Sequence, residues 1–201
     1  MLKVARGVAR YTPNGVVLVS VDPGKHVCGV AVWQDVVLLR AFLVKAPFGD
    51  SYGEMKYAPQ RWVSLAGDVR DTVEEVCAAA GEPLASFHPE EERYLLLERM
   101  QVYAKDGAEK ADDLLDLMGV AGAIAGALPS FLGESVLPSA WKGQVPREVL
   151  AERERLKWLV PGGKVDPRLV LPRDKKTQAD VLAAVSLGRW WFKNHTSKEV
   201  R

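Results

Sequence analysis

The chain has 201 residues, of which 48% are hydrophobic and 26% are charged, and its net charge is +1. This composition is typical of one globular domain with a substantial core, and it excludes an intrinsically disordered chain. The longest apolar stretch, roughly residues 120–132, is too short to span a bilayer, and the two cysteines lack metal-type spacing, so we expect a cytoplasmic protein with no membrane partner.

The first predicted elements form an antiparallel three-stranded meander. Apolar, β-branched runs predict strands over residues 16–22, 27–33 and 36–44, joined by a Pro-Gly turn and a Gln-Asp turn. The segment 46–57 is rich in Gly, Pro and Tyr and predicts a loop.

Helices and strands alternate over the rest of the chain. Apolar residues at helical spacing from Trp62 to Cys77, with Gly81 as a C-terminal stop, predict the first helix. The later predicted elements are a strand over 94–98, a helix from about 108 to 128, a short strand over 134–138, a helix from about 146 to 159 and a helix from about 177 to 192. This order predicts an α/β fold in which a mixed five-stranded sheet, the meander plus two further strands, has helices on both faces.

Two of the predicted strands end in a carboxylate. Asp22 follows the apolar run 16–21, and Glu98 follows the apolar run 94–97. A buried, ionised carboxylate needs a cation or hydrogen-bond donors to offset its desolvation, and two carboxylates on neighbouring strands would also repel each other. A divalent metal resolves this conflict most simply. Asp180, at the beginning of the last predicted helix, is a third candidate ligand, although its charge could instead serve only to stabilise the helix N-terminus.

Basic residues are concentrated near the C-terminus. Residues 138–201 carry 14 Lys and Arg against 7 Asp and Glu, whereas residues 1–137 carry 13 against 19. A basic third of this kind is suited to binding phosphate groups, and the alternative is a set of solvated helix faces.

The order of these motifs resembles that of the RuvC-like Holliday junction resolvases of the ribonuclease H-like superfamily, especially the bacteriophage forms. The resemblance covers about residues 16–192 of a single nuclease domain over 1–201. It rests on four motifs, Val19–Gly24, Leu97-Glu98, Pro138–Gly143 and Gln178–Ala183. It implies a ribonuclease H-like fold and a Mg²⁺-dependent endonuclease that cuts four-way (Holliday) and related branched DNA in recombination and repair. The family also implies a homodimer, which would work in the host cytoplasm if the chain is encoded by a phage.

Three acids and one lysine of this chain match functional positions of that family. Asp22, Glu98 and Asp180 match the metal-binding acids, and Lys142 matches a basic position near the scissile phosphate. Two Mg²⁺ ions about 4 Å apart, for which Mn²⁺ would substitute, can activate water and stabilise the leaving 3′ oxygen. Asp22 is the natural bridging ligand, because its strand is central in such a sheet.

The chain departs from the family pattern at two places. Bacterial members carry an Asp or His where this chain has Thr177, so either Thr177 or Asp174 in the preceding loop is the candidate fourth ligand. They also carry an aromatic residue where this chain has Gln101; Tyr103 either takes over its stacking on DNA or belongs to the core, and we favour the core. The candidate DNA-binding residues are Lys142, Arg173, Lys175, Lys176, Gln101 and Tyr103.

Small residues lie near one face of the helix predicted over 108–128. Gly119, Gly122 and Gly126 allow either close packing within the chain or the dimer contact that the family implies.

Three other classes of protein are alternatives to a junction resolvase. An actin-like ATPase would need a second phosphate-binding domain, for which 201 residues leave no room. A non-catalytic junction-binding protein would not need all three acids, and another ribonuclease H-like nuclease acting on branched DNA or RNA–DNA hybrids stays open.

Overall fold

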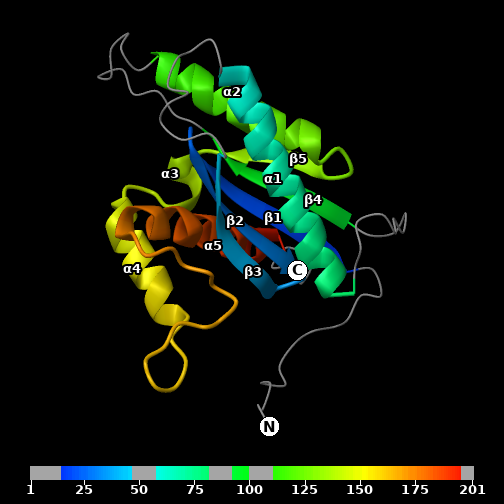
Figure 1. Ribbon diagram of the computed structural model, residues 1–201. Helices are drawn as coiled ribbons and strands as arrows, with labels where there is room; N and C mark the ends of the chain where they lie inside the picture. Colours follow the sequence, from blue (N-terminus) through cyan, green and yellow to red (C-terminus); the bar gives the residue numbers. More distant parts are fainter. Residues whose placement is uncertain (1–14, 47–57, 82–91, 100–110, 196–201) are drawn as a thin grey trace.

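The computed structural model describes residues 15–46, 58–81, 92–99 and 111–195 (Figure 1). In chain order its elements are β1 (Val16–Pro23), β2 (Val27–Gln34), β3 (Val37–Lys45), α1 (Ala58–Ala79), β4 (Glu92–Glu98), α2 (Ala111–Ala127), β5 (Leu132–Val136), α3 (Pro138–Trp141), α4 (Arg147–Lys157) and α5 (Lys175–His195). None of the described helices is long and apolar enough to cross a membrane.

The strands form one mixed sheet in the order β3-β2-β1-β4-β5. The β1–β2 and β2–β3 pairs are antiparallel, which confirms the predicted meander. The β1–β4 and β4–β5 pairs are parallel, so β1 is the central strand and belongs to both halves of the sheet. The α/β class and the predicted composition of the sheet are therefore confirmed.

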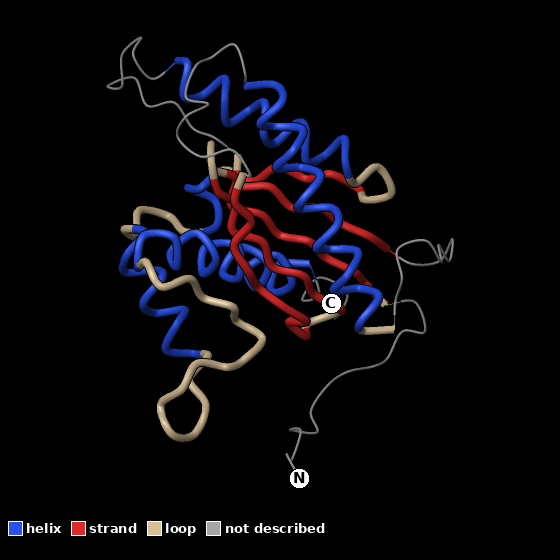
Figure 2. The backbone as a smooth tube through the Cα atoms, in the orientation of Figure 1, coloured by secondary structure: helices blue, strands red, loops and turns tan. Residues whose placement is uncertain are grey.

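Helices cover both faces of this sheet (Figure 2). Helices α1 and α2 pack against each other and build one hydrophobic core with the sheet. Helix α5 builds the second core on the opposite face, and α4 packs on α5. Because α5 is covered by the sheet on one side and by α4 on another, ten consecutive residues, 179–188, are buried.

The alternation of side chains along β1 and β4 determines which face carries the acidic residues. In β1 the odd-numbered positions of the range 17–21 lie in the core with α1 and α2, whereas Leu18 lies in the core with α5. Asp22 has the phase of Leu18, so it belongs to the α5 face. In β4, Glu98 has the phase of Leu96, which also packs against α5. Both carboxylates therefore lie on the face that α5 covers.

The structure corrects the sequence-based boundaries near the middle of the chain. The strand predicted over 134–138 is β5 at Leu132–Val136, and a short helix, α3, begins where the strand was expected to end. Pro138 is its first residue, a position that suits proline because the first helical N–H has no partner within the helix.

The other helix boundaries differ by a few residues. Helix α1 begins at Ala58 rather than near residue 62, and α5 is longer at both ends than the predicted range 177–192. Pro146 is the N-cap of α4 rather than its first residue. All but the first residue of the loop predicted over 46–57, and the first three residues of the helix predicted over 108–128, lie outside the described residues.

Candidate active site

The three predicted acids approach one another on the α5 face of the sheet. Asp22 is the penultimate residue of β1, Glu98 is the last residue of β4, and Asp180 lies in the second turn of α5. The parallel register pairs Val21 with Leu97, so the next residue of each strand is an acid. The sheet thus places Asp22 and Glu98 side by side, and α5 brings Asp180 to them.

A glycine on the neighbouring strand allows α5 to come this close. Gly29 is paired with Asp22 across the β1–β2 ladder. A Cβ atom on Gly29 would lie 2.0 Å from the carbonyl oxygen of Asp180, so any larger residue would force α5 and β2 apart. One helical turn further on, the Ser20 hydroxyl donates a 2.8 Å hydrogen bond to the carbonyl of Ala184 and fixes α5 on the central strand.

Lys142 forms an ion pair with Glu98 and so lies next to the acids, where it was predicted. It follows α3 directly, and its Nζ lies 2.7 Å from Oε1 of Glu98. The other carboxylate oxygen of Glu98, Oε2, is buried and has no hydrogen-bond partner. Because Glu98 is only 7% exposed, this oxygen is a buried acceptor that is available to a further cation.

A second cation, Arg147, was not predicted from the sequence. Its Nη2 donates one 2.6 Å hydrogen bond to Oδ2 of Asp22 and another to Oδ1 of Asp180. A signal for it did exist, because Arg147 is the first residue of α4 and a positive charge is unfavourable at a helix N-terminus. An arginine at such a position is best explained by a carboxylate partner elsewhere in the fold.

Burial perturbs two of the acids. Burial raises the pKa of Asp22 to about 7, with smaller upward contributions from the negative charges of Glu98 and Asp180 and in spite of the positive charge of Arg147. Burial also raises the pKa of Asp180, while Arg147 and then Lys176 act to lower it. In turn, the carboxylates outweigh the effect of burial on Arg147 and raise its pKa. Strongly perturbed, mutually coupled groups of this kind are typical of functional sites.

The donor set fits a hard divalent cation. Three carboxylates supply only oxygen ligands, which is what Mg²⁺ prefers, and one of these oxygens, Oε2 of Glu98, is buried without a partner. As they stand, no three His, Cys, Asp or Glu side chains of the described chain form a group that could hold an ion. In the structure the Arg147 guanidinium bonds to two of these acids, Asp22 and Asp180.

The candidate fourth ligands act together at the beginning of α5. Asp174 is exposed and caps the helix, since its Oδ2 accepts a 3.0 Å hydrogen bond from the backbone N–H of Thr177. That bond lowers the pKa of Asp174. The Thr177 hydroxyl also bonds to Asp174, and neither residue has a hydrogen bond or ion pair to the other three acids. Gln101 and Tyr103 lie outside the described residues.

The predicted DNA-binding lysines at the beginning of α5 border a hollow beside the acids. This hollow, of about 880 Å³, lies between α4 and α5. Arg147, Lys175 and Lys176 line it together with Arg155, so four cations face it. Two acids also line the hollow, and one of them is ion-paired to Arg155. Arg173 is exposed just before α5 and is not among the lining residues.

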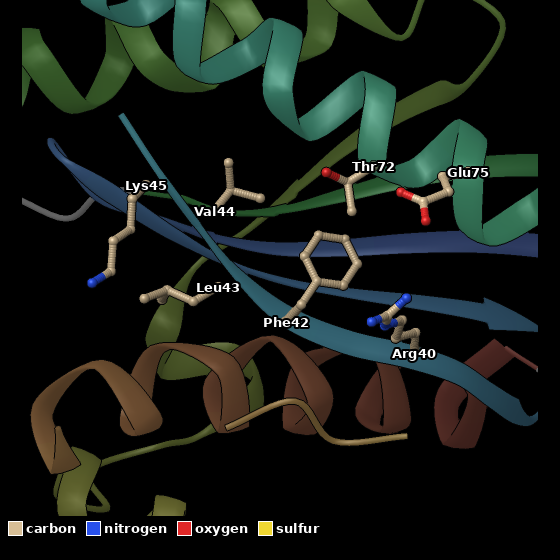
Figure 3. Close-up of a pocket in the computed structure, with 7 residues that line it drawn as sticks. All are labelled: Arg40, Phe42, Leu43, Val44, Lys45, Thr72 and Glu75. Atoms are coloured by element: carbon tan, nitrogen blue, oxygen red, sulfur yellow. The ribbon is translucent and has the colours of Figure 1, made fainter. Parts of the chain in front are cut away.

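A second hollow, of about 330 Å³, lies on the other side of the sheet, between β3 and α1 (Figure 3). Phe42 and Val44 point toward α1 there, whereas Leu43 points to the opposite side of the strand (Figure 3). Among the described residues, Glu75 is the only acid that lines it, and none of the predicted site residues within that part of the chain borders it. The acids and the hollow between α4 and α5 therefore form the candidate site.

The glycines of α2 do not share one environment. A Cβ atom on Gly119 would lie 2.6 Å from the ring of Trp62, so this glycine serves the packing of α2 on α1. Gly122 and Gly126 are exposed and meet nothing within 4 Å. Leu115 and Met118 on the same helix are more than half exposed. The predicted three-glycine contact face is thus corrected to an exposed apolar surface without Gly119.

Comparison with known proteins places this arrangement in a known fold. No family model matches the chain, and no curated protein matches its sequence. Among solved structures it is similar to Thermus thermophilus RuvC in complex with a Holliday junction substrate, with 19% identity, a TM-score of 0.55, and coverage of 90% of this chain and 97% of that one. Another Thermus thermophilus RuvC structure gives 18% identity, a TM-score of 0.52 and the same coverage. The yeast mitochondrial Holliday junction resolvase gives 10% identity and a TM-score of 0.49, covering 88% and 78% of the two chains. The chain has the RuvC, ribonuclease H-like fold.

Proposed function

We propose that this protein is a metal-dependent endonuclease that resolves four-way DNA junctions. The observation that carries the proposal is the meeting of Asp22, Glu98 and Asp180 at one end of the sheet, in a fold shared with a RuvC bound to a Holliday junction substrate. A purely structural role would not need three partly or fully buried acids gathered at one end of the sheet. The narrower affiliation with bacteriophage forms remains a prediction.

The chain's own residues have distinct roles in this proposal. Asp22, Glu98 and Asp180 hold Mg²⁺, or Mn²⁺ in its place. When bound there, the metal would activate the attacking water and stabilise the leaving 3′ oxygen. Lys142 lies on Glu98 and is placed to neutralise a phosphate oxygen next to the acids.

The DNA backbone is proposed to pass along the hollow between α4 and α5. Lys175 and Lys176 border this hollow and lie one to two helical turns before Asp180. Arg173, just before α5, extends the positive charge beyond the hollow. Binding through phosphate contacts of this type releases counterions and is steeply dependent on salt.

The proposed working form is a homodimer with twofold symmetry. A four-way junction needs two symmetry-related cuts, and one chain supplies one set of acids. The exposed surface of α2 formed by Leu115, Met118, Gly122 and Gly126 is the proposed contact, because it is apolar and close approach of a second helix is unobstructed at both glycines.

A panel of synthetic substrates tests the proposal. Four-way junction, flap, linear duplex and RNA–DNA hybrid are incubated with Mg²⁺, with Mn²⁺ and with a chelator. Paired, symmetric cuts confined to the junction and abolished by the chelator are expected. Preferential cutting of the hybrid would instead support another ribonuclease H-like nuclease, and tight junction binding without cutting under any metal would support a non-catalytic junction-binding protein.

A further inference from the structure

Arg147 bonds to the same two carboxylates that are proposed to hold the metal. One guanidinium nitrogen donates to both Asp22 and Asp180, so the side chain supplies the positive charge that these acids require. A metal ion and this guanidinium would compete for the same oxygens.

The rest of α4 is fixed independently of Arg147. Glu154, which is 1% exposed, accepts hydrogen bonds from Lys157 and Trp158 and forms a 3.2 Å ion pair with Arg189 of α5. The ring of Trp158 is in turn covered by the Arg189 guanidinium. These contacts hold the C-terminal half of α4 on α5, whatever the position of the arginine at the other end.

The arginine itself is free to move within this frame. Its side chain is 41% exposed, and residues 148 and 149 of the first turn of α4 are exposed as well. The adjoining hollow between α4 and α5 is lined by Arg147 and by Lys175 and Lys176. Because Arg147 already lines that hollow, a change of side-chain rotamer, with no unpacking of α4, would turn its guanidinium from the acids toward the hollow.

We propose that Arg147 is a built-in counter-ion that occupies the carboxylates of the metal-free protein and is displaced into the hollow between α4 and α5 when the metal binds. The inference rests on the proposed metal-dependent function. In the metal-free protein the arginine prevents the acids from repelling one another. Once displaced, it adds a guanidinium to the lysines that face the DNA backbone, so that phosphate binding at this position is coupled to metal loading.

Calorimetric titration with Mg²⁺ tests the displacement. Arg147→Gln removes the guanidinium that competes with Mg²⁺ for the carboxylates. Because two charge-assisted hydrogen bonds no longer have to be broken, we expect the variant to bind Mg²⁺ at least roughly tenfold more tightly than the wild type, which is about 1.4 kcal/mol. Lys176→Gln is the matched control. It also removes a positive charge that acts on Asp180, but no hydrogen bond to the acid is lost. It should therefore have a clearly smaller effect at physiological ionic strength.

Arg147→Lys covers the case in which the glutamine variant folds poorly. It keeps the charge but loses the planar guanidinium, so its Mg²⁺ affinity should lie between those of the wild type and the glutamine variant. Melting temperatures in chelator should fall in both variants, and Mg²⁺ should raise them by more than it raises that of the wild type. Unchanged or weaker Mg²⁺ binding in both variants, with the wild type still binding Mg²⁺ and cutting junctions, would overturn the displacement alone. Absence of Mg²⁺ binding in all of these proteins would overturn the proposed function as well.

Discussion

Replacing Gly29 by alanine should displace α5 and separate Asp180 from Asp22. The added Cβ atom would lie 2.0 Å from the carbonyl oxygen of Asp180, 2.3 Å from its carbonyl carbon and 2.7 Å from the nitrogen of Val181. All three are backbone atoms, so no side-chain rotation relieves the overlap. Real Cβ contacts are essentially never shorter than 3.0 Å, so the helix and strand must separate by about 1 Å.

This displacement should lower both the free energy of unfolding and the cleavage rate. Overpacking of a core typically costs about 1–3 kcal/mol, and alanine returns about 0.5–1 kcal/mol because it is less flexible than glycine in the unfolded chain. We therefore expect a net loss of up to about 2.5 kcal/mol, with a central value of about 1 kcal/mol, in the free energy of unfolding. An error of about 1 Å in a catalytic constellation is expected to reduce the cleavage rate on the order of 100-fold.

Denaturant unfolding and junction cleavage on the same preparations measure both effects. Gly188→Ala is the matched control, because its Cβ atom would lie 2.4 Å from Trp33 Nε1, two helical turns beyond Asp180. It should lower stability while affecting cleavage much less. Gly67→Ala, which meets nothing within 4 Å, should leave cleavage unchanged and stabilise α1 by up to about 1 kcal/mol. A Gly29→Ala protein with the stability and cleavage rate of the wild type would refute the proposed role of the close contact between α5 and β2.

Three further predictions concern charge, assembly and pH. Charge reversal of Lys175 and Lys176 should weaken binding to every DNA form and reduce the slope of affinity against salt by about one unit per lost phosphate contact, and an unchanged slope would remove these lysines from the DNA path. Gly122→Leu should fold normally, because nothing lies within 4 Å of the added Cβ. The variant should nevertheless shift toward monomer and make single nicks in place of paired cuts. Light scattering that shows a wild-type monomer with paired cutting intact would contradict this prediction. In chelator, the pKa of Asp22, raised to about 7 from an unfolded value near 4, makes the folded state bind the proton more tightly. The free energy of unfolding should therefore fall, by at most about 4 kcal/mol, as pH rises from about 4 to 7, and Asp22→Asn should flatten this dependence; equal pH profiles for the two proteins would count against it.

The features of the fold that local patterns encode were predictable. Apolar runs indicated β1, β2 and β4. The acids at the ends of β1 and β4 were expected to meet if these strands are neighbours, and the structure shows that they are. The short helix α3 was missed because four residues, Pro138–Trp141, are too few to show helical periodicity. The proline that begins it was instead interpreted as the end of a strand.

The features that depend on how elements dock could not be predicted. Arg147 reaches the acids because α4 is anchored on α5 by Glu154 and Arg189, two residues far apart in the sequence. In the same way, helical periodicity could not distinguish Gly119, which contacts Trp62 of α1, from the exposed Gly122. Tertiary contacts between distant segments decide such cases.

Isosteric substitution of the three acids tests the central claim most directly. Asp22→Asn, Glu98→Gln and Asp180→Asn each remove a negative charge with little change in shape, so each should bind a four-way junction with an affinity close to that of the wild type. Each should nevertheless fail to cut the junction in Mg²⁺ or Mn²⁺, because the ligand set for the metal is incomplete. Binding and cleavage are to be measured on the same labelled junction, at one salt concentration. Cleavage near the wild-type rate in any of the three variants would contradict the assignment of that acid to the active site.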